Sequence, residues 1–447
     1  MMIHSTLGKI HSTIQLYLLL MSLVASVQAL NLQMPFLPSH KPVNTLKLKT
    51  IYHHASAHGP IPNLFRKIDI DNTRSDISIN QAQDATYTLQ GTFSVMDKPI
   101  TADIQDLVSQ RKYGTFARWN NRIRPMHLES TIGLVPDVTH RPSVLALAMM
   151  TNNAYLDINL NNTEWYDLGA PWQLLIVVSI KGTSAGLWSG GPTGEKDKLN
   201  DNMLFSCCCA RISRAWTPVC DCYQGNEYKC ENSCLQKSIQ KSELYYDNAL
   251  NIIEDIKEKY ENSTIWITGH SLGGAVASLV GLTYGIPTVT FEIPGDRLAS
   301  SRLHLPSGPG AKDMPLWHFG HTADPIFVGV CTGPSSSCWY GSFAMETRCH
   351  TGKVCVWDTV KDNGWRVDIR SHRVRDVIEN ILKKPEEFPL PNCQPEENCT
   401  DCGLWEYFDD RDAPLSSDSA TSTTSTRTST SQHAPDPPTD PWTSTDE

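Results

Sequence analysis

The sequence predicts an α/β fold in which a mostly parallel sheet is flanked by helices. Residues 264–278 form a β-branched and aromatic run that turns sharply through a G-x-S-x-G pattern into small apolar residues typical of a buried helix. Residues 172–180 are apolar on both faces, as in a strand buried inside a sheet that helices cover. Residues 235–260 carry apolar side chains at helical spacing, so helix, strand, turn and helix form one crossover unit of a parallel sheet.

The sharp turn has the sequence of a nucleophile elbow, in which a serine is held on a strained strand-to-helix connection. Ser271 is the candidate nucleophile, and Gly269 and Gly273 leave no side chain to clash with the neighbouring strand and helix. The backbone N–H of Leu272, at the start of the helix, can point at a developing oxyanion. The alternative is a glycine-rich turn with a surface serine, but the strand before it and the helix after it favour the nucleophile.

Two later residues complete a candidate triad. Asp324 follows a predicted strand, and Pro325 keeps it extended on a rigid turn; a turn or helix-cap aspartate is the alternative. His372 precedes an amphipathic helix, as a base on a loop would, and His350, beside a cysteine, is the competing base. The chain order of Ser271, Asp324 and His372 is the order of an α/β-hydrolase.

A second oxyanion donor is expected where the 172–180 strand ends in a glycine-rich turn. We nominate the backbone N–H of Thr183, although an ordinary strand-to-helix turn would have a similar sequence. The loss of one oxyanion donor raises the barrier by roughly 3 kcal/mol. Together these groups predict hydrolysis of acyl esters without any metal or organic cofactor, and they leave amide hydrolysis open.

The net charge bears on possible partners, and the N-terminal sequence predicts entry into the secretory pathway. The 447 residues carry a net charge of −10 and no basic stripe, which argues against a nucleic-acid partner. Residues 14–30 are uncharged and mostly apolar. They form either a signal peptide cleaved near residues 27–29 or a retained signal anchor whose N-terminal end Lys9 keeps cytoplasmic. Both alternatives direct the rest of the chain into the secretory pathway.

The 14 cysteines agree with an oxidising compartment. Seven of them lie in an insertion at 200–234, where we expect disulfides in preference to a zinc site, because the CxxC pairs of a zinc ribbon are absent. Seven is an odd number, so at least one of these cysteines pairs elsewhere or stays free. We expect two further bridges among Cys331, Cys338, Cys349 and Cys355. The insertion follows the oxyanion turn and contains aromatic residues, which suits a lid that gates lipid access.

The remaining sequence divides the chain and supplies surface features. Histidines at positions 53, 54 and 58 are expected in a solvated loop and not in a metal site. Glycosylation sequons begin at Asn161, Asn262 and Asn398. The expected divisions are a signal-anchor segment at 1–30, a region of unclear role at 31–139, a hydrolase core at 140–385, a cysteine-containing extension at 386–412, and a Ser/Thr-rich disordered tail at 413–447.

Four stretches carry a resemblance to a known family. GHSLGG at 269–274 resembles the class 3 lipases. GTSAGLW at 182–188, KLNDNMLFSCCCAR at 198–211 and HTADPI at 321–326 are similar to the fungal autophagy-related vacuolar lipases. The resemblance spans nearly the whole chain except the C-terminal tail.

The resemblance implies an α/β-hydrolase with the triad Ser271, Asp324 and His372. It also implies a single-pass type II membrane glycoprotein that travels through multivesicular bodies to the vacuole lumen. There the family degrades the phospholipid membranes of autophagic bodies and internal vesicles, with phosphatidylserine and phosphoinositides among its expected substrates. Two alternatives stay open: a secreted triacylglycerol lipase or esterase, and a non-catalytic lipid-binding protein on a hydrolase fold.

Overall fold

The computed structural model describes residues 41–44, 50–54, 65–69, 88–113, 126–156, 175–183, 194–212, 216–225, 228–242 and 244–409. The chain divides into two units, Met1–Phe408 and Asp409–Glu447, and almost all described residues belong to the first. The predicted anchor at 1–30 and the predicted tail at 413–447 lie outside the described residues. Within the described ranges, no helix has the length and apolar character needed to cross a bilayer.

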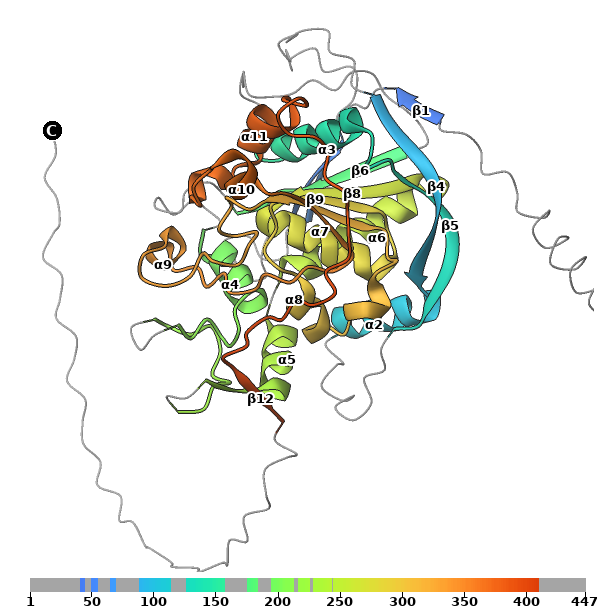
Figure 1. The fold of residues 1–447 in the computed structure, drawn as a ribbon. Coiled ribbons are helices and arrows are strands. Elements are labelled where there is room, and N and C mark those ends of the chain that lie inside the picture. Colours follow the sequence, from blue (N-terminus) through green and yellow to red (C-terminus); the bar gives the residue numbers. More distant parts are fainter. Residues whose placement is uncertain are drawn as a thin grey trace, which may run out of the picture. The chain divides into compact units, whose positions relative to one another are not determined.

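A five-stranded sheet with every pair parallel forms the centre of this unit, in the order β11-β10-β9-β8-β6. Figure 1 labels three of its strands, β6, β8 and β9. The predicted parallel sheet is therefore confirmed. Since parallel strands all end on the same edge, residues that follow β8, β9 and β10 come together there. The strands are β6 at Leu175–Ile180, β8 at Thr264–His270, β9 at Thr288–Phe291, β10 at Leu316–His321 and β11 at Lys353–Trp357.

Helices cover both faces of the sheet (Figure 1). On one face lie α6, Tyr245–Lys259, and α7, Ser271–Tyr284; on the other lies α3, Arg141–Asn153, next to the short α11 at Val374–Val377. The side chains of strand β8 pack into the two cores on opposite faces of the sheet, because successive side chains of a strand point to opposite faces. Trp266 packs in the cluster that contains α3, whereas Ile267 packs in the cluster that contains α6 and α7.

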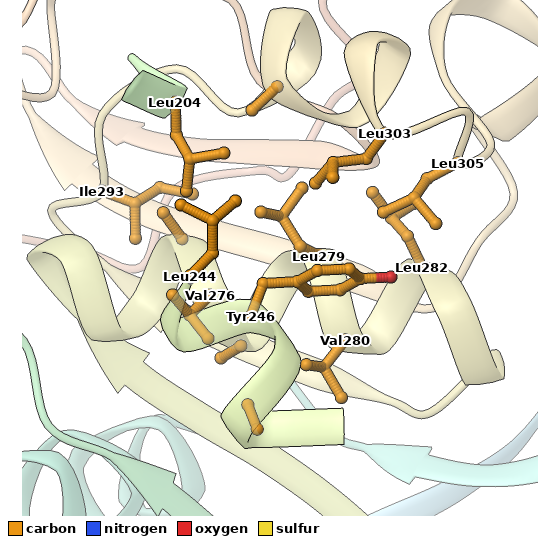
Figure 2. Packing of buried hydrophobic residues seen from close by; sticks show 14 of the residues in the cluster. Leu204, Leu244, Tyr246, Val276, Leu279, Val280, Leu282, Ile293, Leu303 and Leu305 are labelled. Carbon is orange, nitrogen blue, oxygen red and sulfur yellow. The ribbon is translucent and has the colours of Figure 1, made fainter. Parts of the chain in front are cut away.

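The larger core lies between α6 and α7, where α7 is buried along its whole length. Its small residues allow the helix to approach the sheet closely, and its leucines and valines fill the space toward α6, α4 at Gly194–Leu204 and α8 at Arg297–Arg302. Figure 2 shows the side chains that meet there, including Leu204, Leu244, Tyr246, Val276, Leu279, Val280, Leu282, Ile293, Leu303 and Leu305.

The other elements surround this sandwich. β1, Lys41–Asn44, β4, Thr88–Pro99, and β5, Leu128–Pro136, form an antiparallel sheet whose Leu134 carbonyl accepts a hydrogen bond from the Trp266 ring. The rest are β2 at Thr50–His54, β3 at Phe65–Asp69, α2 at Thr101–Tyr113, β7 at Lys229–Glu231, α5 at Asn232–Lys241, η2 at Gly308–Ala311, α9 at Ser337–Gly341, α10 at Thr359–Asn363, η3 at Ile369–His372, η4 at Ile378–Leu382 and β12 at Glu406–Phe408.

Three sequence predictions about these elements are corrected. The single helix expected at 235–260 is two helices, because the chain is extended at Leu244 and the Asn200 side chain accepts from the Tyr245 N–H. The strand expected to be buried on both faces begins at 175 and lies at the end of the described sheet, so most of its residues are half-buried. Two of the three histidines expected in a loop lie in β2, which pairs with β3; the third lies outside the described residues.

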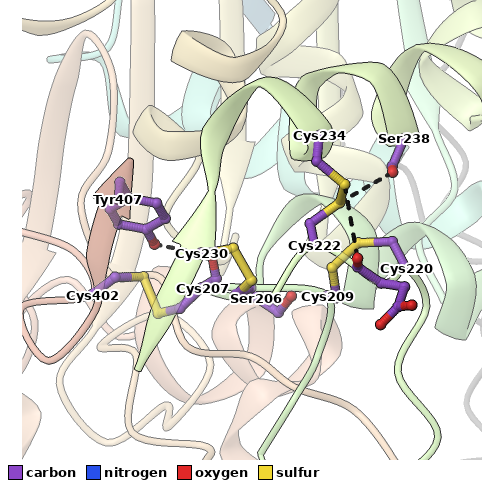
Figure 3. The surroundings of a disulfide bond; sticks show 12 residues. Ser206, Cys207, Cys209, Cys220, Cys222, Cys230, Cys234, Ser238, Cys402 and Tyr407 are labelled. Atoms are coloured by element: carbon purple, nitrogen blue, oxygen red, sulfur yellow. Dashed lines mark hydrogen bonds between the residues drawn. A yellow bond between two sulfur atoms is a disulfide. The ribbon is translucent and has the colours of Figure 1, made fainter. Parts of the chain in front are cut away.

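All 14 cysteines are paired, in seven disulfides, which confirms the preference for disulfides over zinc. Three bridges close within the 200–234 insertion, and its odd cysteine, Cys207, pairs with Cys402 of the C-terminal extension (Figure 3). The two bridges expected among the four later cysteines are wrong in part. Cys331 does pair with Cys338, but the other two bond to the extension, as Cys349–Cys399 and Cys355–Cys393.

We expect Leu279→Ala to lower the free energy of unfolding by about 2–5 kcal/mol, because the side chain is fully buried and its removal leaves a cavity between α7 and its neighbours. Urea unfolding of the purified chain measures this. Val95→Ala is the matched control, since Val95 is 66% exposed on β4 and should change stability by less than about 1 kcal/mol. Equal losses in the two variants would contradict the assignment of the core.

Candidate active site

The turn from β8 into α7 forces Ser271 into a left-handed backbone conformation, with a φ of 55°. A non-glycine residue rarely adopts this conformation, and it persists only where the surroundings impose it. The glycines on either side explain how the turn fits. A Cβ atom on Gly273 would lie 2.4 Å from the Ile180 carbonyl oxygen, and one on Gly269 would lie 2.7 Å from the Gly273 carbonyl oxygen. The elbow therefore packs backbone against backbone on both sides of the serine.

The structure brings the three predicted triad residues together. The His372 Nε2 atom lies 2.8 Å from the Ser271 hydroxyl, and its Nδ1 atom lies 2.7 Å from an oxygen of Asp324. Asp324 follows β10 and His372 ends η3, so both loops meet the elbow at the edge where the parallel strands end. With Asp324 ionised, Nδ1–H donates to the carboxylate and Nε2 accepts the serine proton.

Asp324 is held in its charged form. Burial alone would raise the pKa of this fully buried carboxyl, but the charge and hydrogen bond of His372, with a hydrogen bond from Glu292, lower that pKa to about 2. Its second oxygen accepts the backbone N–H of Ile326 at 2.9 Å. Because this pKa is depressed, the charge stabilises the folded chain above about pH 4, and the contribution disappears as the pH falls through 2.

The competing base, His350, lies elsewhere. Its ring stacks on Phe327 with centroids 4.5 Å apart, and its Nε2 atom lies 3.2 Å from the Ile293 carbonyl oxygen. Burial lowers the pKa of His350, but Glu396 and Asp296 raise it more, so the net shift is upward. His350 therefore holds the C-terminal extension through Glu396, whereas His372 is the histidine placed against the serine.

The two nominated oxyanion donors lie on adjoining turns. Gly182 packs so closely on the elbow that a Cβ atom there would lie 2.4 Å from the His270 carbonyl oxygen, which places Thr183 beside the start of α7. The Thr183 hydroxyl donates to Asp201 of α4 at 2.9 Å. Asp201 is fully buried, and burial raises its pKa well above the usual range. The Leu272 side chain is also buried, and its N–H is in the first turn of α7.

Sequence reasoning missed His270, the neighbour of Ser271. Its Nε2 atom lies 2.6 Å from the His372 carbonyl oxygen, and its Nδ1 atom lies 2.7 Å from the hydroxyl of Tyr155. Burial lowers the pKa of His270 to about 3, so the ring is neutral, and Nε2–H donates while Nδ1 accepts from the tyrosine. The end of α3 and the end of β8 thus fix the loop that carries His372. The position of His270 inside GHSLGG was the available signal.

Glu292 is the second group that was missed. It follows β9 with a φ of 47°, is completely buried, and accepts the His321 N–H at 3.3 Å. Burial first, and then the charge of Asp324 and the hydrogen bond between the two carboxyl groups, raise the pKa of Glu292 well above the usual range. A neutral carboxyl group here can donate to Asp324. Its place at the end of the strand beside the elbow was the only signal in the sequence.

The other predicted surface features are placed in part. Asn262, just before β8, and Asn398, in the extension, are exposed, as a glycan requires; Asn161 lies outside the described residues. Glycosylation itself stays a prediction. In the described part of the chain, the sulfur atoms of Cys209, Cys220 and Cys222 lie within 4.8 Å of one another, but each sulfur belongs to a disulfide and is not a thiolate ligand.

Comparison with known proteins gives a family model and close relatives. Residues 210–286 match the model described as Lipase (class 3). The chain is 38% identical over 427 residues to "Putative lipase ATG15" of Yarrowia lipolytica, covering 84% of this chain and 75% of that protein. It is 44% identical over 328 residues to the protein of the same name from Vanderwaltozyma polyspora, covering 67% of this chain and 57% of the relative.

Among solved structures, the nonglycosylated LIP2 lipase of Yarrowia lipolytica aligns with 40% of this chain and 57% of its own. The identity is 20% and the TM-score is 0.21.

We expect Glu292→Gln to gain stability relative to the parent chain as the pH rises from about 4 to 7. Because the folded-state pKa of Glu292 is raised, the parent chain must bind a proton to fold at neutral pH, so its stability falls as the pH rises above about 4.3. Glutamine keeps a donor without that requirement. Urea unfolding of both chains at several pH values measures the difference, with the exposed Glu406→Gln as control. A difference that does not vary with pH would contradict a neutral Glu292.

Proposed function

This chain belongs to the fungal ATG15 family of class 3 lipases, and on that premise we propose that it is a serine lipase that hydrolyses acyl esters of membrane phospholipids. The observation that carries the serine mechanism is the position of His372, whose two ring nitrogens lie within hydrogen-bond distance of Ser271 and Asp324. By family the protein is a lipase.

In the proposed reaction, the Ser271 hydroxyl attacks the acyl carbonyl while His372 Nε2 takes its proton. The imidazolium then returns the proton to the leaving alcohol, and the acyl group stays on the serine. Water attacks the acyl-enzyme in the same way and releases the fatty acid. Asp324, charged and fully buried, keeps the proton on Nδ1 and stabilises the imidazolium.

The tetrahedral oxyanion would be held by the backbone N–H groups of Thr183 and Leu272. The hydrogen bond from the Thr183 hydroxyl to Asp201 fixes the turn that carries Thr183. The close contact of Gly182 with the elbow fixes the distance between the Thr183 N–H and the Leu272 N–H. Rigid donors of this kind cost no reorganisation when charge develops, which is why they lower the barrier.

We propose further that the protein is a type II membrane glycoprotein of the endosomal pathway, anchored by residues 14–30, and acts in the vacuole lumen on autophagic bodies and internal vesicles. The name ATG15 that its relatives carry suggests a role in autophagy. The seven disulfides support a lumenal position of the catalytic unit, because disulfides persist in oxidising compartments.

We propose that part of the insertion acts with α9 as a lid. The insertion begins inside α4, and Cys207–Cys209 are buried and bonded, so this portion is a fixed base. Trp216 instead lies against Trp339 of α9, with ring centroids 5.1 Å apart. Trp339 directly follows Cys338, whose bridge to Cys331 closes the neighbouring loop. An aromatic contact between two stapled loops can open without unfolding the core.

We expect Ser271→Ala to reduce fatty-acid release by at least about 10³-fold, and Asp324→Asn by about 10⁴-fold through the wrong histidine tautomer. Ser278→Ala is the matched control, because Ser278 lies on the same helix but donates to Asp296 and not to the triad. Release is measured per folded molecule. Undiminished fatty-acid release by Ser271→Ala would contradict the serine mechanism. Full biological activity of a Ser271→Ala chain that releases no fatty acid would favour a non-catalytic lipid-binding protein.

We expect the purified chain to release fatty acid from vesicles that contain phosphatidylserine and phosphatidylcholine, and to depend on Ser271 for it. A triolein emulsion is tested in parallel. Release from triolein alone would move the protein to the triacylglycerol alternative, since the triad serves either ester equally well.

A further inference from the structure

We infer that residues 360–376, here called the arginine rim, form a docking surface for an anionic bilayer beside the catalytic histidine. This inference rests on the proposed membrane substrate and adds how the enzyme reaches it. The rim comprises α10, η3 and the start of α11, and therefore includes the loop that carries His372. None of its lysine or arginine side chains takes part in the triad.

The rim is basic on an acidic protein. It carries five basic side chains and three carboxylates, whereas the whole chain has a net charge of −10. The basic residues are exposed: Lys361, Arg366, Arg370, Arg373 and Arg375.

Two of the three carboxylates are already close to arginines. Asp368 pairs with Arg370 at 2.6 Å. Burial raises the pKa of Asp376, and the charges of Arg373 and Arg375 oppose that shift. A positive potential therefore remains over the rim, which favours phosphate groups at a bilayer surface.

Exposed apolar side chains alternate with these charges. Val367 is 49% exposed between Arg366 and Asp368, and Val360 is 37% exposed beside Lys361. Arginines and lysines can place their charged ends among head groups while neighbouring apolar side chains enter the acyl boundary. This mixture suits a lipid surface better than a nucleic acid or a soluble acidic protein, because neither of those provides an apolar phase in which the valines can be buried.

A hollow in the rim gives the head group a place. Its volume is about 530 Å³, and its walls combine Trp365, Arg366, Arg370 and Asn380 with the carboxylates of Asp368 and Asp376. Ser371, the residue before His372, also lines it and holds the loop through a hydrogen bond to the Ala323 carbonyl oxygen at 2.9 Å. A head group bound here would lie on the loop of the catalytic base.

The recessed site explains why such a surface is needed. Ser271 is 5% exposed and the His372 side chain 13% exposed, so a lipid must leave the plane of the bilayer to reach them. An enzyme held by electrostatic contact next to that opening shortens the distance the acyl ester has to travel. Weak, reversible docking also permits movement along the membrane between turnovers.

The test measures binding apart from catalysis. Full-length Ser271→Ala chain is sedimented with vesicles of phosphatidylcholine alone, or of phosphatidylcholine with about one third phosphatidylglycerol. We expect at least about tenfold tighter binding to the anionic vesicles, declining as salt is raised. Adding Arg366→Gln and Arg373→Gln should remove most of this preference. Adding Lys237→Gln and Lys312→Gln, which neutralise two exposed lysines on α5 and after η2, should leave it within about twofold.

Four results would contradict the docking surface or the proposed function. Equal binding to the two kinds of vesicle, or equal losses in the arginine and lysine pairs, would overturn the docking surface. Displacement by millimolar inorganic phosphate or glycerophosphate would assign the hollow to soluble anions and not to a bilayer. The proposed function fails separately, if the parent chain cannot hydrolyse a soluble short-chain ester in a Ser271-dependent manner.

Discussion

The steric constraint at the turn between β8 and α7 is the feature on which the rest of the site depends. The backbone there has no room for a Cβ atom at either glycine, and Ser271 is forced to a positive φ. That conformation is unfavourable for a serine, so it must be sustained by packing elsewhere. The fully buried α7 provides this, because a helix that cannot move away from the sheet keeps its first residue in place.

Buried polar groups also fix the two loops that carry Asp324 and His372. His270 and Tyr155 hold the carbonyl of His372, and the Ile326 N–H holds Asp324. These groups lie where water cannot compete, so each hydrogen bond is stronger than it would be in solvent. Within this buried site the pKa values of the two adjacent acids differ. The pKa of Asp324 is lowered, so it is charged, and the pKa of Glu292 is raised, so it is neutral.

Covalent bonds tie the C-terminal extension to this core. Three disulfides reach from residues 393–402 to Cys207, Cys349 and Cys355, and the buried Arg302 donates to the carbonyl groups of Ser206 and Cys207. The extension also adds β12 beside β7. The 200–234 insertion is consequently anchored from the far end of the chain by a disulfide that spans 195 residues of sequence.

The sequence by itself determined the parallel sheet, the elbow and the three residues that now lie together at one sheet edge, because these depend on local patterns: strand, tight turn, helix, and chain order. Tertiary structure decided the rest. Glu292 and His270 acquire their roles only from neighbours brought close by folding, and the pairing of Cys349 and Cys355 depends on where the extension returns. The break at Leu244 also needs a partner from α4: the Asn200 side chain accepts a hydrogen bond from the Tyr245 N–H, 45 residues away in sequence. The spacing of apolar residues in the sequence predicts helices and strands, whereas contacts between segments distant in sequence depend on how these elements pack.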